Sequence, residues 1–193
     1  MKEYNFYALA ARMKYINRWG LMRNTEKENV KEHSLDVAII AHALAVINNT
    51  IFGGAVDAGR TALMAIYHDM SEIITGDMPT PVKYNNSGII SAYKEIEAEA
   101  NRRLLDRLPK KMRGAYEDIF FPGEEDEYIK KLVKAADKIS AYIKCIEEES
   151  AGNKEFSQAK YATEKAIGKF DLPEVKYFME TFIPAYYLTL DEI

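Results

Sequence analysis

The sequence predicts an all-α fold, because apolar residues recur with helical spacing along most of the chain and no useful stretch alternates apolar and polar residues as a strand would. Its 193 residues are 48% hydrophobic and 29% charged, which is typical of one globular domain of ordinary size. Neither an internal repeat nor a low-complexity segment divides the chain. We therefore expect a single-domain helical bundle over residues 1–193.

The overall composition limits the possible partners. A net charge of -4 argues against an extended surface for a nucleic acid polymer, which would need clustered positive charge. Cys145 is the single cysteine, so an intrachain disulfide is excluded and a buried thiol is expected. The N-terminus lacks the apolar core of a signal peptide, and the longest apolar run, 37–47, is too short to span a bilayer. These features predict a reduced, cytoplasmic protein that does not enter a membrane.

The first half of the chain predicts three helices. Residues 4–16 have the pattern of a short amphipathic helix. Thr25 and Glu28 form a capping-box pattern that predicts a helix to about Asn48, apolar nearly all round from Val37 onward and therefore central and buried.

The next helix carries the most conspicuous polar residues. Asp57 can cap it, and it would run through His68, Asp69 and Glu72 to a stop at Gly76. The prolines that follow predict that residues 77–84 are extended, because proline is excluded from a helix interior.

The second half predicts four or five further helices. Ser87 would cap a long helix to Leu108, and Pro109 would begin a short one that ends near Phe121. A strong apolar stripe predicts a helix over 124–150. The remaining apolar spacing predicts one or two more helices, over 156–168 and 173–184.

Three polar side chains share one sector of the predicted second long helix. At about 100° per residue, Glu72 projects about 40° from His68 and about 60° from Asp69. His33 faces inward on the preceding helix, among its apolar positions. A His-Asp pair near a helix end is often merely solvated, and a buried histidine is often satisfied by one carbonyl, so these residues alone leave a structural role open.

Two imidazoles with carboxylates are the donors of a mixed nitrogen and oxygen site for Mn, Fe, Co, Ni or Zn. The loop 17–24 adds Arg18 and Trp19. A single tryptophan is often a core anchor, but beside an arginine in a turn it could stack on a ring while the guanidinium binds an anion. A glycine-rich phosphate loop, a Cys-x-x-Cys pair, a nucleophile elbow and a His-Glu-x-x-His motif are all missing from the sequence.

Several motifs, in order, resemble those of HD-domain phosphohydrolases. They are Glu32-His33-Ser34, the stretch from Tyr67 to Glu72, and Ala135-Ala136-Asp137-Lys138. More narrowly, the chain resembles the bacterial YfbR-type 5'-deoxynucleotidases, over nearly its whole length. That resemblance rests on Asn17-Arg18-Trp19, Met22-Arg23-Asn24, Glu28-Asn29-Val30, the stretch from Thr75 to Tyr84, and the tail Leu190-Asp191-Glu192-Ile193.

The resemblance implies a dimeric, all-helical enzyme that removes the 5'-phosphate from deoxyribonucleoside monophosphates with one divalent metal, such as Co, Mn or Cu. The implied metal ligands are His33, His68, Asp69 and Asp137. Arg18 would orient the phosphate and Trp19 would stand where a 2'-hydroxyl would clash. Glu72 would handle protons. The implied contacts to the substrate also include Asp69, Asp137, Asp77, Met78, Pro79 and Thr80.

The remaining candidates are expected to be structural or solvated. Lys83 is expected to be a solvated lysine, and His42, opposite His33 on its helix, is expected to be structural. Weak discrimination among bases is expected, since ordinary loop residues would contact the base.

Two alternatives remain at this stage. One is another HD phosphohydrolase that acts on cyclic dinucleotides, guanosine polyphosphates or triphosphates; a total of three histidines favours one metal over two. The other is a non-catalytic module that uses the site as a metal staple or nucleotide sensor. The presence of Glu72 and Arg18 counts against a pure staple, which needs neither.

Overall fold

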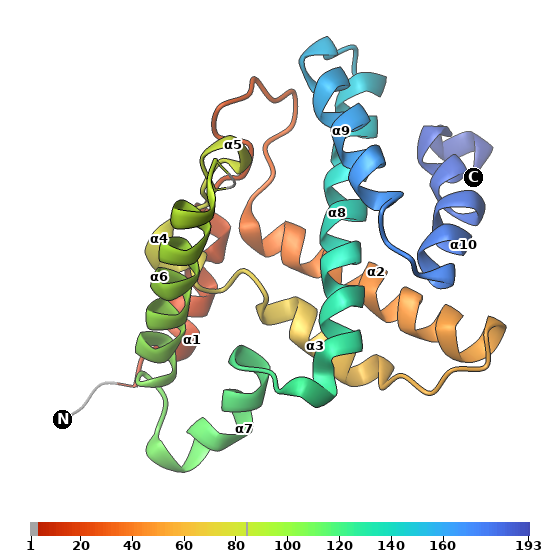
Figure 1. The fold of residues 1–193 in the computed structure, drawn as a ribbon. Helices are drawn as coiled ribbons and strands as arrows, with labels where there is room; N and C mark the ends of the chain where they lie inside the picture. Colours follow the sequence, from red (N-terminus) through yellow and green to blue (C-terminus); the bar gives the residue numbers. More distant parts are fainter. Residues whose placement is uncertain (1–3, 84) are drawn as a thin grey trace.

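A computed structural model describes residues 4–83 and 85–193 (Figure 1). Within those ranges the regular structure is helical, with one isolated antiparallel bridge between Asn17 and Asn29, which confirms the all-α prediction. Tyr84, the end of one quoted motif, and the first three residues lie outside the described residues. The α-helices are α1 (Phe6–Ala10), α2 (Val30–Ile51), α3 (Ala58–Tyr67), α4 (Glu72–Thr75), α5 (Thr80–Lys83), α6 (Ser87–Leu105), α7 (Lys110–Phe120), α8 (Glu127–Ser150), α9 (Ser157–Ile167) and α10 (Pro173–Thr181).

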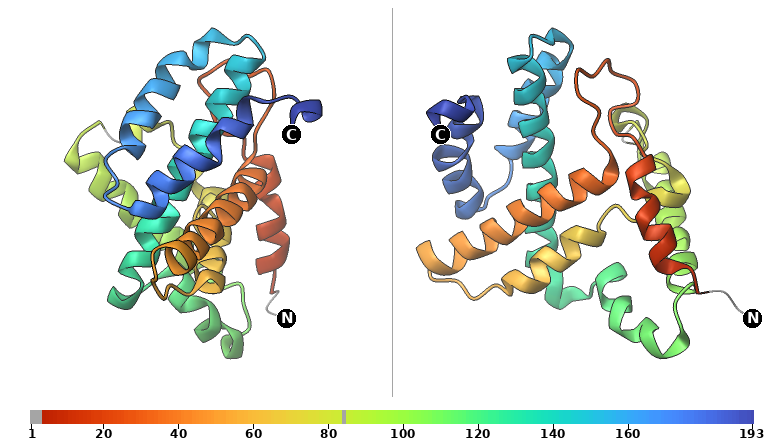
Figure 2. Two further views of the ribbon diagram at one scale, coloured as in Figure 1. Left: turned by 90° about the vertical axis from the view of Figure 1, so that its right-hand side faces the viewer. Right: turned by 180° about the vertical axis from the view of Figure 1, so that it is seen from behind.

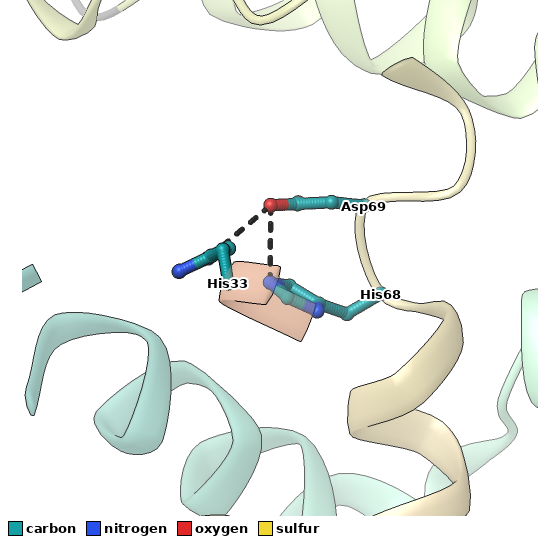
Figure 3. A group of neighbouring side chains, drawn as sticks. All are labelled: His33, His68 and Asp69. Atoms are coloured by element: carbon teal, nitrogen blue, oxygen red, sulfur yellow. Dashed lines mark ion pairs between the residues drawn. The ribbon is translucent and has the colours of Figure 1, made fainter. Parts of the chain in front are cut away.

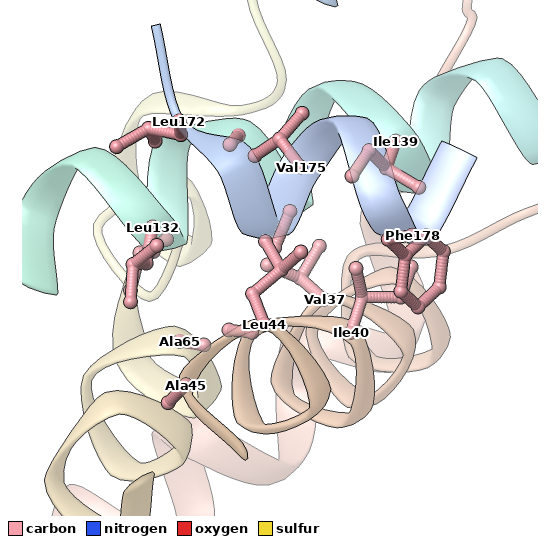
Figure 4. Close-up of a cluster of buried hydrophobic side chains, with 14 of the residues drawn as sticks. Val37, Ile40, Leu44, Ala45, Ala65, Leu132, Ile139, Leu172, Val175 and Phe178 are labelled. Atoms are coloured by element: carbon pink, nitrogen blue, oxygen red, sulfur yellow. The ribbon is translucent and has the colours of Figure 1, made fainter. Parts of the chain in front are cut away.

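The main core forms where α2 crosses α8 and packs on α3 (Figure 2). Apolar side chains of α2, α3 and α8 meet there, and α10 covers them from another side (Figure 4). Each fully buried aliphatic side chain contributes about 1.5–3 kcal/mol of hydrophobic stabilisation. Among the buried members are Val37, Ile40, Leu44, Ala65, Leu132, Ile139, Val175 and Phe178.

A second, smaller apolar cluster joins α1, the start of α2, the turn after α3, α6 and α7. Two segments of the chain run from one cluster to the other. Val30 belongs to the small cluster and Val37 to the main one, while Ala65 belongs to the main cluster and Met70 to the small one. The segments between these pairs, which contain the predicted ligands His33, His68 and Asp69, therefore lie at the boundary between the two clusters.

The start of α2 differs from the prediction. Asn29 caps the helix, because its side chain accepts hydrogen bonds from the backbone N–H groups of Lys31 and Glu32 at 3.0 and 3.1 Å. The expected capping box of Thr25 and Glu28 is wrong. Both of these residues are used in tertiary contacts instead, which are described below.

The helix expected over 58–75 is broken. It ends at Tyr67, and the chain turns through residues 68–71 before α4. Backbone bonds of the tighter i to i+3 kind, such as Met70 N–H to Tyr67 C=O at 3.1 Å, replace the α-helical pattern. The helical-wheel argument for His68, Asp69 and Glu72 therefore does not describe their true arrangement. The predicted stop is confirmed, because Gly76 has a φ of 73°.

Three other helix boundaries differ from the prediction. Residues 4–16 form α1 followed by a 3₁₀ turn (Ala11–Tyr15) rather than one helix. Asn86, not Ser87, caps α6, which ends at Leu105. Residues 80–83 form the single helical turn α5 within the segment that was expected to be extended; Pro81 is tolerated because the first turn needs no internal N–H donor.

One face of α2 is not covered. Leu35, Ile39 and Val46 are exposed, so the expectation of a helix buried all round is wrong for this face. The same helix is long and apolar enough to cross a membrane, but half of the relevant stretch is buried inside this fold, as in the central helix of a globular domain.

Cys145 is buried, as expected.

Candidate active site

The predicted ligands converge from three parts of the chain. His33 comes from α2, and His68 and Asp69 come from the turn after α3 (Figure 3). Asp69 Oδ2 lies 3.1 Å from His68 Nε2 and 3.5 Å from His33 Nε2, and one donor atom from each residue lies within 4.8 Å of the other two. Asp137, on α8, adjoins this group through a 3.3 Å contact from its Oδ1 to His33 Nε2.

Both imidazoles are held through the nitrogen that faces away from Asp69. His68 Nδ1 lies 2.7 Å from the carbonyl oxygen of Ala65, and His33 Nδ1 lies 3.2 Å from Ser140 Oγ. The two Nε2 atoms are buried and have no hydrogen-bond partner among the described residues. A buried polar atom is normally satisfied, so two unpartnered imidazole nitrogens beside carboxylates fit a divalent metal.

The charge states of the carboxylates suit the same role. Burial works against their ionisation, but the neighbouring histidines hold the pKa of Asp69 well below its usual range. Burial is likewise outweighed at Asp137, whose pKa is held far below its usual range by the contact with His33 and the charge of Lys138. Both carboxylates are therefore ionised at neutral pH, which is the form that binds a metal.

Glu72 has the opposite electrostatic behaviour. Its side chain is buried, and its Oε2 has no hydrogen-bond partner among the described residues. Burial first, and then the negative charges of Asp69 and Asp77, raise the pKa of Glu72 to about 9. A carboxyl group that retains its proton at neutral pH close to ionised carboxylates is suited to proton transfer.

Arg18 lies against the ligand group. Its Nη1 is 3.5 Å from Asp69 Oδ2, and its Nε donates to Glu28 Oε2 at 3.1 Å. The adjacent Trp19 donates from Nε1 to the same Glu28 oxygen at 2.7 Å, and its ring packs on Phe156 with centroids 5.2 Å apart. Trp19 has a φ of 58°, a left-handed conformation that costs a bulky residue about 1–3 kcal/mol and persists where contacts hold it.

A pocket of about 540 Å³ opens beside these residues. Arg18 and Trp19 line it on one side, and the predicted substrate residues Asp77, Met78, Pro79 and Thr80 line it as well. A further wall comes from α9 and was not predicted, because the small and polar residues on this face of α9 have no motif. That wall includes Gln158, Ala159, Ala162, Thr163 and Ala166.

Three further residues differ from expectation or were missed. Lys83 is not a freely solvated lysine: it pairs with Glu97 at 2.9 Å and lies over the ring of Tyr93. Glu28 and Ser140, which contact Arg18, Trp19 and His33, were not predicted as site residues. Among the histidines, His42 is exposed on the other side of α2.

Comparison with known proteins identifies the family. The family profile described as "5'-deoxynucleotidase YfbR-like" matches residues 5–186. The chain belongs to the YfbR-like 5'-deoxynucleotidase family. It is 51% identical to the 5'-deoxynucleotidase of Vibrio cholerae over 193 residues, the full length of both chains. It is 50% identical to the 5'-deoxynucleotidase YfbR of Escherichia coli, over all of this chain and 97% of that one. The resemblance drawn from the motifs is confirmed, and the protein is an enzyme of this family.

Solved structures confirm the HD-domain fold. An HD-domain phosphohydrolase from Listeria innocua superposes with a TM-score of 0.83 at 22% identity, over 94% of this chain and 88% of that one. The cyanophage S-2L HD phosphohydrolase DatZ, solved with dA and one catalytic Zn²⁺ ion, superposes with a TM-score of 0.68 at 17% identity, over 94% and 96% of the two chains.

Proposed function

We propose that this enzyme hydrolyses the 5'-phosphate of deoxyribonucleoside monophosphates to the deoxynucleoside and phosphate, with one divalent transition metal per chain. The observation that carries the proposal is the pair of buried Nε2 atoms of His33 and His68, which have no hydrogen-bond partner among the described residues. They are gathered with two carboxylates and Arg18, and Arg18 also lines the adjacent pocket. The names of the relatives and the nucleoside in the phage structure support the same substrate class.

The metal would be held by His33, His68, Asp69 and Asp137. Once bound, such an ion lowers the pKa of a water and neutralises charge on phosphoryl oxygens. The chemistry of the donors admits Co, Mn or Cu, as the family resemblance implied, and Zn, the ion in the phage enzyme.

Arg18 and Glu72 supply the other charges that the reaction needs. The guanidinium of Arg18 binds the phosphate oxygens, for which its planar group of donors is well suited. Glu72 carries the proton that the leaving 5'-oxygen must receive, since its raised pKa favours the protonated carboxyl.

The pocket sets the selectivity for the sugar and the base. Trp19 stands beside the sugar and leaves no room for a 2'-hydroxyl, so deoxyribonucleotides are preferred over ribonucleotides. Residues 77–80 contact the nucleoside. The α9 wall has small side chains such as Ala159 and Ala162, which leave space for either a purine or a pyrimidine, so little base preference is expected.

The test measures phosphate release from a panel of deoxy and ribo monophosphates, triphosphates and cyclic dinucleotides, with Co, Mn, Cu or Zn added to chelator-treated protein. Release only from deoxy monophosphates supports the proposal, and preference for triphosphates or cyclic dinucleotides favours the other HD enzymes. Glu72→Ala is expected to lower kcat by at least about 10²-fold with metal affinity unchanged. A non-catalytic metal staple would instead show no phosphate release in either protein.

The proposal includes a cytoplasmic homodimer that acts on free nucleotides and requires neither a nucleic acid polymer nor a membrane. The exposed face of α2 and the C-terminal segment enclose an apolar groove of about 520 Å³ lined by residues such as Ile39, Ala43, Phe182, Leu188 and Ile193. Large exposed apolar patches are typical of protein interfaces, so we place the second subunit on this groove. Phe178 also lines the groove, but its side chain is mostly buried in the core.

A further inference from the structure

Glu28 lies beside the site without facing the pocket. It is buried, with a side chain that is 9% exposed. One of its oxygens, Oε2, accepts hydrogen bonds from two consecutive residues, at 3.1 Å from Arg18 Nε and at 2.7 Å from Trp19 Nε1. A single carboxylate oxygen therefore fixes both the guanidinium and the indole.

The backbone around Glu28 is itself fixed. Its carbonyl oxygen accepts from Arg18 N–H at 3.0 Å, and Val30 N–H donates to Ile16 at 2.9 Å. These bonds tie the segment before α2 to the loop that carries Arg18 and Trp19. Because Asn29 then caps α2, the carboxylate is held in a constant position relative to the helix that carries His33.

Glu28 also decides which nitrogens of Arg18 remain free. Its contact takes up Nε, so the two terminal nitrogens are left to face the site, where Nη1 lies 3.5 Å from Asp69 Oδ2. Without Glu28, the guanidinium would move further onto the carboxylates of Asp69 and Asp137, which already attract it. The donors needed for phosphate would then be occupied.

Trp19 depends on the same contact. Its backbone has a φ of 58°, which a bulky side chain adopts only when its surroundings enforce it. Among the described residues, the hydrogen bond to Glu28 and the packing on Phe156 both orient the indole. Without the hydrogen bond, we expect the indole to be more mobile.

A role for Glu28 in orienting the imidazole of His33 is less well supported by the distances. Glu28 Oε1 lies 3.7 Å from His33 Nδ1, which is beyond hydrogen-bond distance. That nitrogen pairs with Ser140 Oγ at 3.2 Å instead.

We propose that Glu28 is a positioning residue. Through one carboxylate oxygen, it fixes the phosphate-binding Arg18 and the sugar-discriminating Trp19 in their orientation relative to each other. It thereby couples orientation of the phosphate to rejection of ribonucleotides. This inference rests on the proposed function for the roles of the two residues, while the contacts themselves can be tested without turnover.

The first measurement uses Trp19 as a reporter, because it is the single tryptophan of the chain. In Glu28→Ala we expect a red-shifted emission, lower anisotropy and at least a twofold larger Stern–Volmer constant for acrylamide quenching. Glu28→Gln retains one oxygen acceptor and is expected to show an intermediate change. Glu26→Gln, an exposed glutamate of the same loop, is the control and is expected to match the wild type.

The second measurement compares dAMP and AMP hydrolysis in the same variants. Glu28→Ala is expected to lower kcat/KM for dAMP by at least tenfold and to reduce the dAMP to AMP selectivity ratio at least fivefold. Mn²⁺ affinity, measured by calorimetry, is expected to stay within twofold of the wild type. A residue that only stabilises the fold would lower the melting temperature without changing the selectivity ratio.

Two results would overturn the proposal. One is an unchanged quenching constant and selectivity ratio in a folded Glu28→Ala protein, or in Glu28→Gln if the alanine variant does not fold. The other is a tenfold loss of Mn²⁺ affinity with no change at the indole, which would assign Glu28 to His33. Failure of the wild-type protein to release phosphate from dAMP would instead contradict the proposed function and leave the fluorescence result to decide the role of Glu28.

Discussion

Ser140 orients the imidazole of His33 from α8, a helix that is distant in the sequence but packs on α2. Its Oγ lies 3.2 Å from His33 Nδ1, and metal ligation through Nε2 requires that Nδ1–H donate to this oxygen. The carbonyl of Ala65 has the same role for His68. Such partners fix the tautomer and the ring plane, and losing one usually lowers metal affinity 10–100-fold.

Replacing Ser140 with alanine tests this orientation. We expect Ser140→Ala to bind Mn²⁺ about tenfold more weakly, because the ring of His33 would lose its anchor, with the fold unchanged by circular dichroism. Ser34→Ala is the matched control: Ser34 is also buried and adjoins His33, but its hydroxyl has no hydrogen-bond partner among the described residues. Equal metal affinity in the two variants would contradict the assignment.

At this scale, the convergence of the candidate ligands was easier to predict from the sequence than the side chains that hold them in place. The inward position of His33 followed from periodicity, and the approach of Asp137 to the group agrees with the family motif, although its place at the edge of an apolar stripe did not mark it. Glu28 was misassigned because Thr25 and Glu28 have the spacing of a capping box. Its true partners, Arg18 and Trp19, are brought close only by the tertiary fold, which local spacing does not encode.

Between the 3₁₀ turn and α2, the chain forms a long loop that carries Arg18 and Trp19, and Glu148 of α8 holds its far end. The carboxylate of Glu148 is fully buried. It accepts from the backbone N–H and the hydroxyl of Thr25 at 2.9 and 2.6 Å, and from Lys144 and Asn153. Thr25 therefore anchors the loop to α8 instead of starting α2.

Breaking this anchor is expected to cost stability. Glu148→Ala would leave the buried ammonium of Lys144 without its charge partner, although it still donates to the carbonyl oxygen of Glu26. We expect the free energy of unfolding to fall by about 3–5 kcal/mol in urea titrations. Glu127→Ala, on the same helix, removes the exposed pair with Lys130 and is expected to cost less than about 1 kcal/mol. Similar losses in both variants would show that the loop is held elsewhere.

The same carboxylate predicts a pH effect. Burial favours its protonated form, but the hydrogen bonds from Lys144, Thr25 and Asn153 outweigh burial and hold the pKa of Glu148 well below its ordinary value. A lowered folded-state pKa adds stability above the unfolded value of about 4.3, and this stability is lost as the pH falls below it. Glu148→Gln is therefore expected to be less stable than the wild type at pH 7 and to lose less stability than the wild type on acidification. Urea titrations at pH 7 and below about pH 4.3 measure the difference.

At the scale of elements, the long periodic helices α2, α6 and α8 were predicted within a few residues. The break between α3 and α4 was not, because every residue from Tyr67 to Glu72 is compatible with a helix. The turn there places Met70 in the smaller apolar cluster and brings Asp69 toward both histidines. Tertiary packing outweighs local propensity at this point.

At the scale of the whole molecule, α2 and the C-terminal segment present an uncovered apolar face among the described residues. If a second copy covers this face, a charge placed there would be buried without a partner. We expect Ile39→Asp to shift the protein from dimer to monomer in light scattering after size exclusion. Leu21→Asp, at an exposed apolar residue of the loop before α2, is the control. A monomeric wild type would refute the dimer.

The fold class followed from the sequence because helical periodicity is a local signal that spans the chain. The division of the interior into two clusters could not be predicted in this way. It depends on which helices meet, and apolar stripes alone do not specify their partners. The α9 wall of the pocket was missed for the same reason.

The boundary between the two clusters has a thermal consequence. His33, His68 and Asp69 lie in the segments that join one interior to the other, so their spacing depends on how the two halves sit together. Gentle warming that loosens only the smaller half would pull the donors apart while α2, α3 and α8 stayed folded. The enzyme would then be inactivated at a lower temperature than the one at which its helices melt.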